Sequence, residues 1–272
     1  MNVLQPEPIL QRNLDDAPWD AAIGHRLPGT GPVAADDWLR MDDAFAAQMA
    51  LRDRLITQNQ PLIYAATPNA EPAAAEILHM ALDVLKTRPG YHVTPTSVTR
   101  PDGVRIDLAD QPALQTLGRL VQEDICLLQK RGDEHVLTAA ILCFPASWTL
   151  AEKFDRPLTG IHEPVDEYTD NIATRVQRLF NGLRAGRPLM RQNCLFYEDA
   201  ALFQPRSMAD RRDKKARILG YVRTERQCLL RLPVSDAVAF TIHTTVMDRS
   251  ALPKPDASRL DAFMNAASTH QA

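Results

Sequence analysis

The stretch YVRTERQCLLRLPVSDAVAFTIHTT, residues 221–245, decides the expected fold. Two strand-like runs, 221–232 and 237–245, flank the turn-forming segment Pro233-Val234-Ser235-Asp236. Extended runs joined by a short turn of this composition indicate a β-hairpin. The C-terminal part of the chain is therefore predicted to contribute a long antiparallel strand pair.

Two more segments extend the predicted sheet. Residues 125–130 and 135–144 are strand-like and are joined by Arg131-Gly132-Asp133-Glu134, which predicts a second hairpin. Residues 189–197 form a further strand-like run. Strands linked as hairpins pair antiparallel, and strict alternation of strands and helices is absent. A Rossmann or TIM-barrel architecture is therefore disfavoured.

Apolar residues at helical spacing dominate the first half of the chain. The expected helices follow a cap at Asp36 or Asp37, start at Glu71-Pro72 and at Gln111-Pro112, and run from about Tyr168 to Leu183. The order is thus helices first, then hairpin, helix, strand and hairpin. This order predicts an α+β fold class, an antiparallel sheet with helices packed on one face.

The same patterns divide the chain into four regions that we expect to form one compact unit. Residues 1–35 carry five prolines and are predicted to form an extended N-terminal arm. Residues 36–124 are expected to be a helical region that packs on the core. The sheet domain is expected over 125–250, and 251–272 should be a C-terminal tail.

Composition and motifs exclude several classes of protein. The net charge of −3 gives no sign of nucleic-acid or membrane-surface binding. No apolar run approaches the roughly 20 residues of a membrane helix, and no secretion signal begins the chain. The four scattered cysteines are typical of reduced thiols, so we expect a cytoplasmic protein without its own zinc or iron–sulfur site. Nucleotide-binding, zinc-peptidase and serine-hydrolase motifs are absent.

His162 is the first candidate for a functional side chain. It lies in Ile161-His162-Glu163-Pro164-Val165, a proline-framed turn expected between the sheet and the following helix. A structural zinc needs about four ligands, and the neighbourhood offers only Glu163 and Asp166. One histidine is enough for heme, because the porphyrin supplies the equatorial nitrogens. A packed structural histidine is the alternative, and His243 is the other histidine expected to face the interior or a cleft.

The run 221–232 is unusually polar for a buried strand. Side chains alternate between faces along a strand, so Glu225 and Gln227 share one face, whereas Arg226 and Cys228 share the other. Two interpretations stay open. The run is either an edge strand with cross-strand ion pairs, or a strand that supplies polar groups to a cofactor or substrate.

Three separated stretches resemble one known family in their order and spacing. They are Leu142–Trp148 with Glu152-Lys153, Ile161–Val165, and Arg223–Pro233 with Phe240–Ile242. Arg191 and Asn193 also resemble the R-x-N strand of that family. Over roughly residues 15–250, the chain resembles the α subunit of heme-dependent oxidative N-demethylase.

That resemblance implies a PAS-like fold that binds heme b and its iron. It implies a monooxygenase that uses O2 to remove a methyl group, as formaldehyde, from a small secondary amine such as dimethylamine. Electrons would come from NADPH through separate reductase subunits that carry FMN and a 2Fe-2S cluster. The alternatives are a non-catalytic PAS-like heme or gas sensor and a protein with only an interaction role.

The resemblance also implies roles for single residues. His162 becomes the proximal ligand of the heme iron. The candidates for pairing with heme propionates are Arg223, Arg226 and Arg231. The candidates for binding a substrate ammonium or polarising oxygen are Glu225, Gln227, Tyr168 and Asn193. Cys194 and Cys228 depart from the tryptophan and threonine expected there, which points to a different pocket shape and amine.

Overall fold

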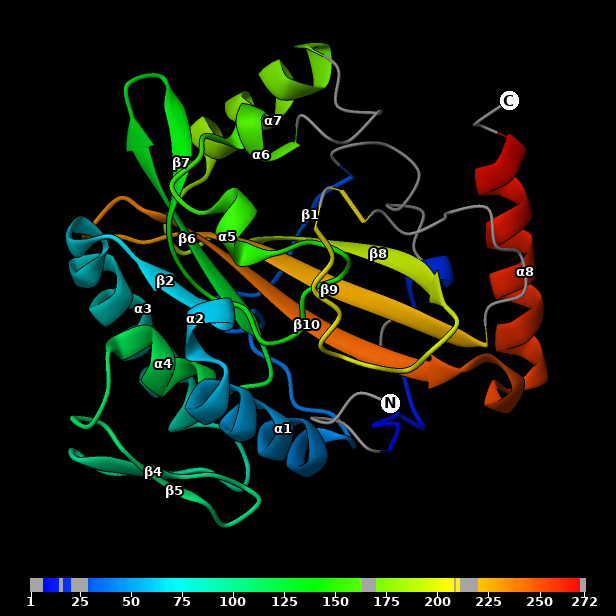
Figure 1. Ribbon diagram of the computed structural model, residues 1–272, viewed down its shortest axis with the longest axis horizontal. Helices are drawn as coiled ribbons and strands as arrows, with labels where there is room; N and C mark the ends of the chain where they lie inside the picture. Colours follow the sequence, from blue (N-terminus) through cyan, green and yellow to red (C-terminus); the bar gives the residue numbers. More distant parts are fainter. Residues whose placement is uncertain are drawn as a thin grey trace.

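The computed structural model of the chain describes residues 7–14, 17–20, 29–162, 170–207, 209–210 and 220–269. Its centre is a seven-stranded antiparallel sheet with the order β1-β8-β9-β10-β6-β7-β2 (Figure 1). The strands are β1 (Gly31–Pro32), β2 (Tyr64–Ala66), β6 (Asp124–Arg131), β7 (Glu134–Ile141), β8 (Leu189–Tyr197), β9 (Tyr221–Arg231) and β10 (Val238–Asp248). The predicted α+β class and both predicted hairpins are confirmed.

Eight α-helices are found in the described part of the chain. They are α1 (Phe45–Gln58), α2 (Gln60–Ile63), α3 (Glu71–Leu85), α4 (Ala113–Gly118), α5 (Leu150–Lys153), α6 (Leu158–His162), α7 (Asp170–Gly182) and α8 (Lys254–Thr269). None of these described helices is both long and apolar enough to cross a bilayer.

A smaller sheet lies beside the helical region (Figure 1). Its strands are β3 (His92–Val93), β4 (Ser97–Thr99) and β5 (Arg105–Asp107). Arg100, which follows β4, pairs with Asp53 of α1 at 3.0 Å and donates to the carbonyl of Arg119 at 2.7 Å. Because Arg100 is 1% exposed, these contacts fasten the small sheet to α1 and α4 from within.

Alternation along the strands divides the apolar side chains between two cores, one on each face of the large sheet. We call the side of Cys228 and Leu230 the first face; it packs against helix residues that include Leu51, Leu55, Ile77 and Leu114. We call the side of Leu229 the second face; it packs against Leu150, Leu158, Ile161 and Phe180. Helices therefore cover both faces, α1, α3 and α4 on the first and α5 to α7 on the second, whereas one covered face was expected.

The first helix begins at Phe45 rather than after the expected cap. The carboxylate of Asp37 pairs with Arg40 and Arg226 at 2.9 Å instead of accepting backbone N–H groups. Asp42 forms a turn just before the helix, since its Oδ1 accepts the N–H of Ala44 at 2.9 Å, and the N-cap residue Ala44 makes no side-chain cap. A sequence pattern shows which residues can cap a helix, but not which one is free to do so.

The segment between β7 and His162 also differs from the prediction. Strand β7 ends at Ile141, because beyond Leu142 the N–H groups of Cys143 and Phe144 donate to the buried carboxylate of Asp124 at 2.7 and 2.8 Å. The short helices α5 and α6 follow, and His162 is the last residue of α6 rather than part of a turn.

Candidate functional site

Polar side chains of β8 and β9 form a cluster on the second face. The strand register places Asn193 opposite Glu225, and Gln227 lies two residues further along the same face. The side-chain amides of Asn193 and Gln227 both donate to Oε2 of Glu225, at 3.0 and 2.9 Å. Glu225 is only 6% exposed. Three of the four predicted catalytic residues thus form one hydrogen-bonded group, which we call the Glu225 cluster.

Arg223 lies beside this cluster but is held by backbone groups. Its guanidinium donates to the carbonyls of Phe144 and Leu202 and lies over the ring of Tyr197. Its Nε is 3.7 Å from Oε1 of Glu225, which is too long for a hydrogen bond. These contacts already use both terminal nitrogens of the guanidinium, so a propionate would have to displace a backbone carbonyl to pair with Arg223.

The other two predicted propionate partners have different surroundings. Arg226 points to the first face, where it pairs with Asp37 at 2.9 Å and donates to the Asp37 carbonyl at 2.7 Å. Arg231 lies at the end of β9 and donates to the carbonyls of Phe180 and Asp236. Because neighbouring residues of a strand face opposite sides, Arg226 and Glu225 cannot contact the same ligand.

The structure describes the backbone of His162 but not its side chain, and it does not describe Tyr168. His162 ends α6, directly after Ile161, which is buried in the second-face core. Its backbone is therefore on the side of the sheet that carries the Glu225 cluster. The side chain of His162 and the whole of Tyr168 lie outside the described part of the chain. Their roles stay predictions.

Two half-buried cations on the second face were not assigned a role from the sequence. Lys153, the last residue of α5, places its Nζ 4.4 Å from the centre of the Trp148 ring. Arg191 lies opposite Gln227 on β8. Burial lowers the pKa of both cations, although the charge of Glu225 partly offsets this. The resemblance includes both positions, but no pattern in the sequence indicates that both interact electrostatically with Glu225.

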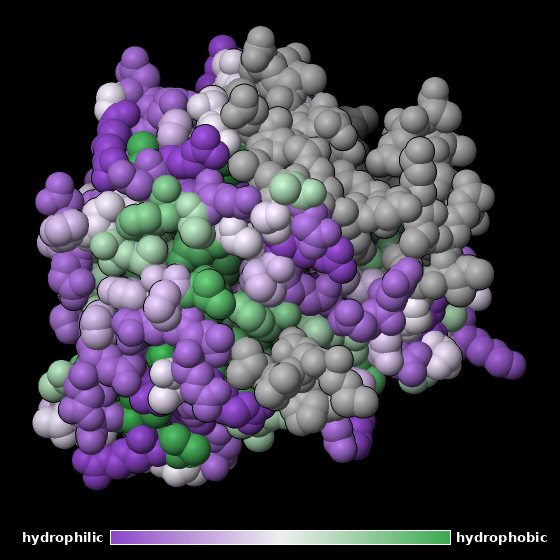
Figure 2. All heavy atoms as spheres, in the orientation of Figure 1, coloured by the Kyte–Doolittle hydropathy of each residue, from purple (hydrophilic) through white to green (hydrophobic). Residues whose placement is uncertain are grey.

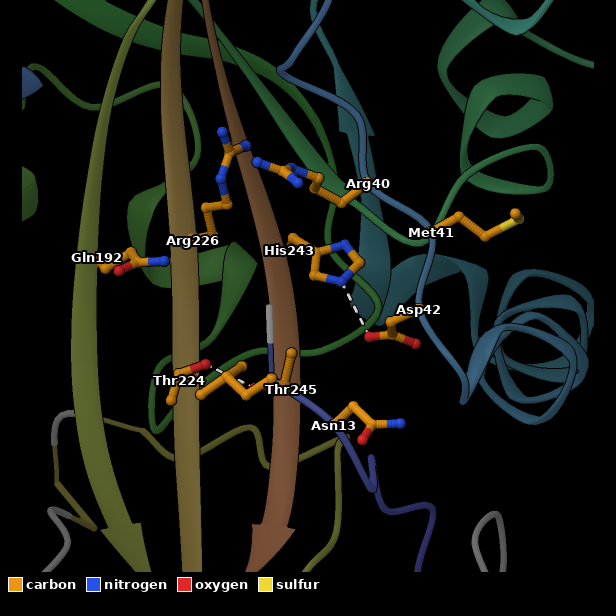
Figure 3. A pocket seen from close by; sticks show the side chains of 10 residues that line it. Asn13, Arg40, Met41, Asp42, Gln192, Thr224, Arg226, His243 and Thr245 are labelled. Atoms are coloured by element: carbon orange, nitrogen blue, oxygen red, sulfur yellow. Dashed lines mark hydrogen bonds and ion pairs between the residues drawn. The ribbon is translucent and has the colours of Figure 1, made fainter. Parts of the chain in front are cut away.

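The first face carries a closed charged network around His243 (Figure 3). Its Nδ1 is 3.0 Å from Oε1 of Glu123 and its Nε2 is 3.0 Å from Oδ2 of Asp42. Burial opposes a charge on His243, but the hydrogen bonds to the two carboxylates outweigh burial and raise its pKa to about 9. Both ring nitrogens are occupied, so the network is built for stability rather than for binding iron.

A pocket of about 50 Å³ lies next to this network. Its lining comes from the N-terminal region and from β8, β9 and β10: Asn13, Leu14, Arg40, Met41, Asp42, Gln192, Thr224, Arg226, His243 and Thr245 (Figure 3). This volume holds a few water molecules and is far too small for a porphyrin. The first-face pocket is therefore not a candidate heme site.

Residues 29–269 match the family model described as haem-dependent oxidative N-demethylase, alpha subunit-like. The chain belongs to this family. The matched region includes every strand of the large sheet and all residues of the Glu225 cluster. No individually curated protein gives a significant match to the chain.

For an oxidative N-demethylase alpha subunit-like protein, the second face offers groups that suit heme and an amine. Its core is apolar, and its cations Lys153 and Arg191 suit the carboxylates of a porphyrin. Oδ1 of Asn193 is buried and accepts no hydrogen bond from any described residue. An unsatisfied buried acceptor is costly unless a ligand supplies a donor. No group of three metal-binding side chains occurs in the described residues.

Proposed function

We propose that the chain is the catalytic α subunit of a heme b-dependent monooxygenase that demethylates a small secondary amine, such as dimethylamine, with O2. The amine nitrogen would bind at the Glu225 cluster, and heme would bind on the second face with His162 as the iron ligand. The proposal rests on family membership together with the geometry of the Glu225 cluster.

One observation supports the substrate class most directly. Among the described residues, Oδ1 of Asn193 is buried without a hydrogen-bond donor, and Oε1 of Glu225 faces only the guanidinium of Arg223, at 3.7 Å, beyond hydrogen-bond distance. A protonated secondary amine carries two N–H donors and one positive charge. It can donate to both oxygens and place its charge beside the buried carboxylate. A tertiary amine has one N–H, and a quaternary ammonium has none.

Each residue of the Glu225 cluster would have a different role around the substrate nitrogen. Heme, when bound, supplies oxygen activation, which no amino-acid side chain provides. Oε1 of Glu225 would hold the ammonium N–H and accept its proton, which leaves the nitrogen lone pair free. The amides of Gln227 and Asn193 hold the carboxylate by its other oxygen, Oε2. The apolar second-face core would exclude water from the reaction.

The overall reaction needs electrons that the chain's own thiols are not suited to supply. Dimethylamine, O2, two electrons and two protons give methylamine, formaldehyde and water. Burial raises the pKa of Cys126, Cys143 and Cys194 to about 12, so these thiols stay protonated and are poor ligands for an iron–sulfur cluster. We therefore propose that electrons from NADPH reach the heme through separate reductase subunits that carry FMN and 2Fe-2S centres. We also propose that the protein works in the cytoplasm.

Turnover of the heme-reconstituted protein tests this proposal. NADPH with a ferredoxin reductase and ferredoxin serves as the electron source, and O2 uptake and formaldehyde are measured with dimethylamine, trimethylamine and tetramethylammonium. We expect activity to fall in that order, which is the order of decreasing N–H donors. Glu225→Gln should lower amine-dependent formaldehyde release by about 100-fold or more, a typical loss for a key charged group.

Glu198→Gln provides the matched control. Glu198 follows β8 and is exposed, so its loss should leave the rate unchanged. Equal rates for Glu225→Gln and the wild type would remove the proposed role of Glu225. Heme binding and O2 binding with no formaldehyde from any amine would favour the sensor interpretation instead.

A further inference from the structure

We propose that Arg191 and Lys153 form the subsite for the two carboxylates of the porphyrin, an inference that rests on the proposed heme-binding function. Both side chains belong to the second face, and neither is among Arg223, Arg226 and Arg231, the partners that the resemblance implies. The two groups differ in whether their cations are already paired in the fold.

In the three arginines indicated by the resemblance, both terminal nitrogens of the guanidinium are engaged elsewhere. Arg223 donates to two backbone carbonyls, and Arg231 does the same at the other end of β9. Arg226 is on the opposite face in an ion pair with Asp37. A porphyrin carboxylate that bound to any of them would have to break contacts that now join separate elements of the fold.

Arg191 has no such contacts. Its guanidinium makes no hydrogen bond or ion pair with any described residue, although the side chain is only partly exposed. Its register opposite Gln227 turns it toward the side of the Glu225 cluster. Burial disfavours a guanidinium without a carboxylate partner, and that cost is offset when a carboxylate binds with two parallel hydrogen bonds.

Lys153 is the second unpaired cation near Glu225. Its ammonium lies over the Trp148 ring and forms no ion pair within the described residues. It is half-buried at the end of α5, a helix whose Leu150 belongs to the second-face core. Both Lys153 and Arg191 interact electrostatically with Glu225. The face therefore presents two unpaired cations beside one carboxylate, which suits a ligand with two carboxylates.

The test compares hemin with hemin dimethyl ester, in which both carboxylates are blocked. The apo-protein is titrated with each compound and the Soret absorbance gives the Kd for the wild type, Arg191→Gln, Lys153→Gln and the double variant. Arg187→Gln and Lys130→Gln are the matched controls, because both side chains are exposed. We expect each site substitution to weaken hemin binding by about 10-fold, the usual scale for one charge-assisted hydrogen bond.

The ester separates a carboxylate contact from a general loss of structure. We expect the wild type, the two single variants and the double variant to bind the ester with the same affinity. The two control variants should bind both compounds as the wild type does. Arg191→Lys should bind hemin with intermediate affinity, because it keeps the charge but loses the bidentate geometry. Equal losses for hemin and the ester, or no loss for either, would overturn the subsite while leaving heme binding intact. A wild type that binds neither compound would overturn the proposed function itself.

Discussion

The two faces of the large sheet use charged residues in different ways. On the first face the buried charges of two networks have opposite partners: His243 lies between Asp42 and Glu123, and Arg52 pairs with Asp124 at 2.7 Å. Both members of the Arg52–Asp124 pair are completely buried. These networks join α1, β6 and β10, so their charges serve the fold.

On the second face the polar groups are incompletely satisfied. Arg191 and Lys153 have no carboxylate partner among the described residues, and Oδ1 of Asn193 accepts no hydrogen bond there. Folded proteins keep such groups only at a cost, which a bound ligand can offset. A count of buried charges therefore does not identify a binding site. Cations without a carboxylate partner distinguish the second face, because buried polar atoms without a hydrogen bond, such as Oε2 of Glu123, occur on the first face as well.

The largest effect should come from breaking the first-face ion pair. Arg52→Met leaves the carboxylate of Asp124 buried without its cation, and the pKa of Asp124 is already raised by burial. We expect a loss of about 3–5 kcal/mol in the free energy of unfolding, measured by denaturant titration. The exposed neighbour Arg54, changed to Met, should shift stability by less than about 0.5 kcal/mol. Similar values for the two variants would show that the pair does not stabilise the fold.

The His243 network predicts a dependence of stability on pH. The folded-state pKa of about 9 is above the ordinary value of 6.5, so the stabilising contribution is complete below pH 6.5 and is lost as the pH rises through 9. The contribution is on the order of 3 kcal/mol. Unfolding of the wild type and His243→Gln should be compared from pH 6 to pH 10. The difference between their free energies of unfolding should decrease at high pH. A difference that stays constant or increases would contradict the positive charge assigned to His243.

A substitution in the Glu225 cluster of the second face should change stability less than the two first-face substitutions do. Gln227→Ala removes one of the two amides that hold Glu225, so it should lower stability by about 1 kcal/mol. Because Glu225 then loses its fixed orientation, KM for dimethylamine should rise about 10-fold with less change in kcat. Gln60→Ala, at an exposed position of α2, is the control for both measurements. A large loss of stability without a change in KM would place Gln227 among the structural residues.

Most of the sheet could be predicted from the sequence, because hairpin signals are local. The expected strand 189–197 has the bounds of β8, and the pair 221–232 and 237–245 differs from β9 and β10 by at most three residues at each end. Period-2 alternation also placed Glu225 and Gln227 on one face before the structure was known. Local patterns were sufficient for these elements.

The packing could not be predicted, because it depends on contacts between distant residues. Nothing in the sequence indicates that Asp124 accepts the N–H groups of Cys143 and Phe144, which ends β7 and leads to α5 and α6. In the same way, no local signal distinguishes Arg226, paired with Asp37, from Arg191, which is unpaired. The resemblance therefore points to the arginines of β9, whereas their pairing in the folded chain is the basis on which we propose Arg191 and Lys153 instead.

The most direct test compares His162, the proposed iron ligand on the second face, with His243, which lies in the charged network of the first face. Purified wild type, His162→Ala and His243→Gln are titrated with hemin, and the Soret band is recorded in the ferric and ferrous states. His79→Ala, at an exposed position of α3, is the control. We expect His162→Ala to lose the histidine-ligated spectrum, whereas His243→Gln and His79→Ala should keep it. A spectrum lost in His243→Gln and retained in His162→Ala would contradict the assignment of heme to the second face.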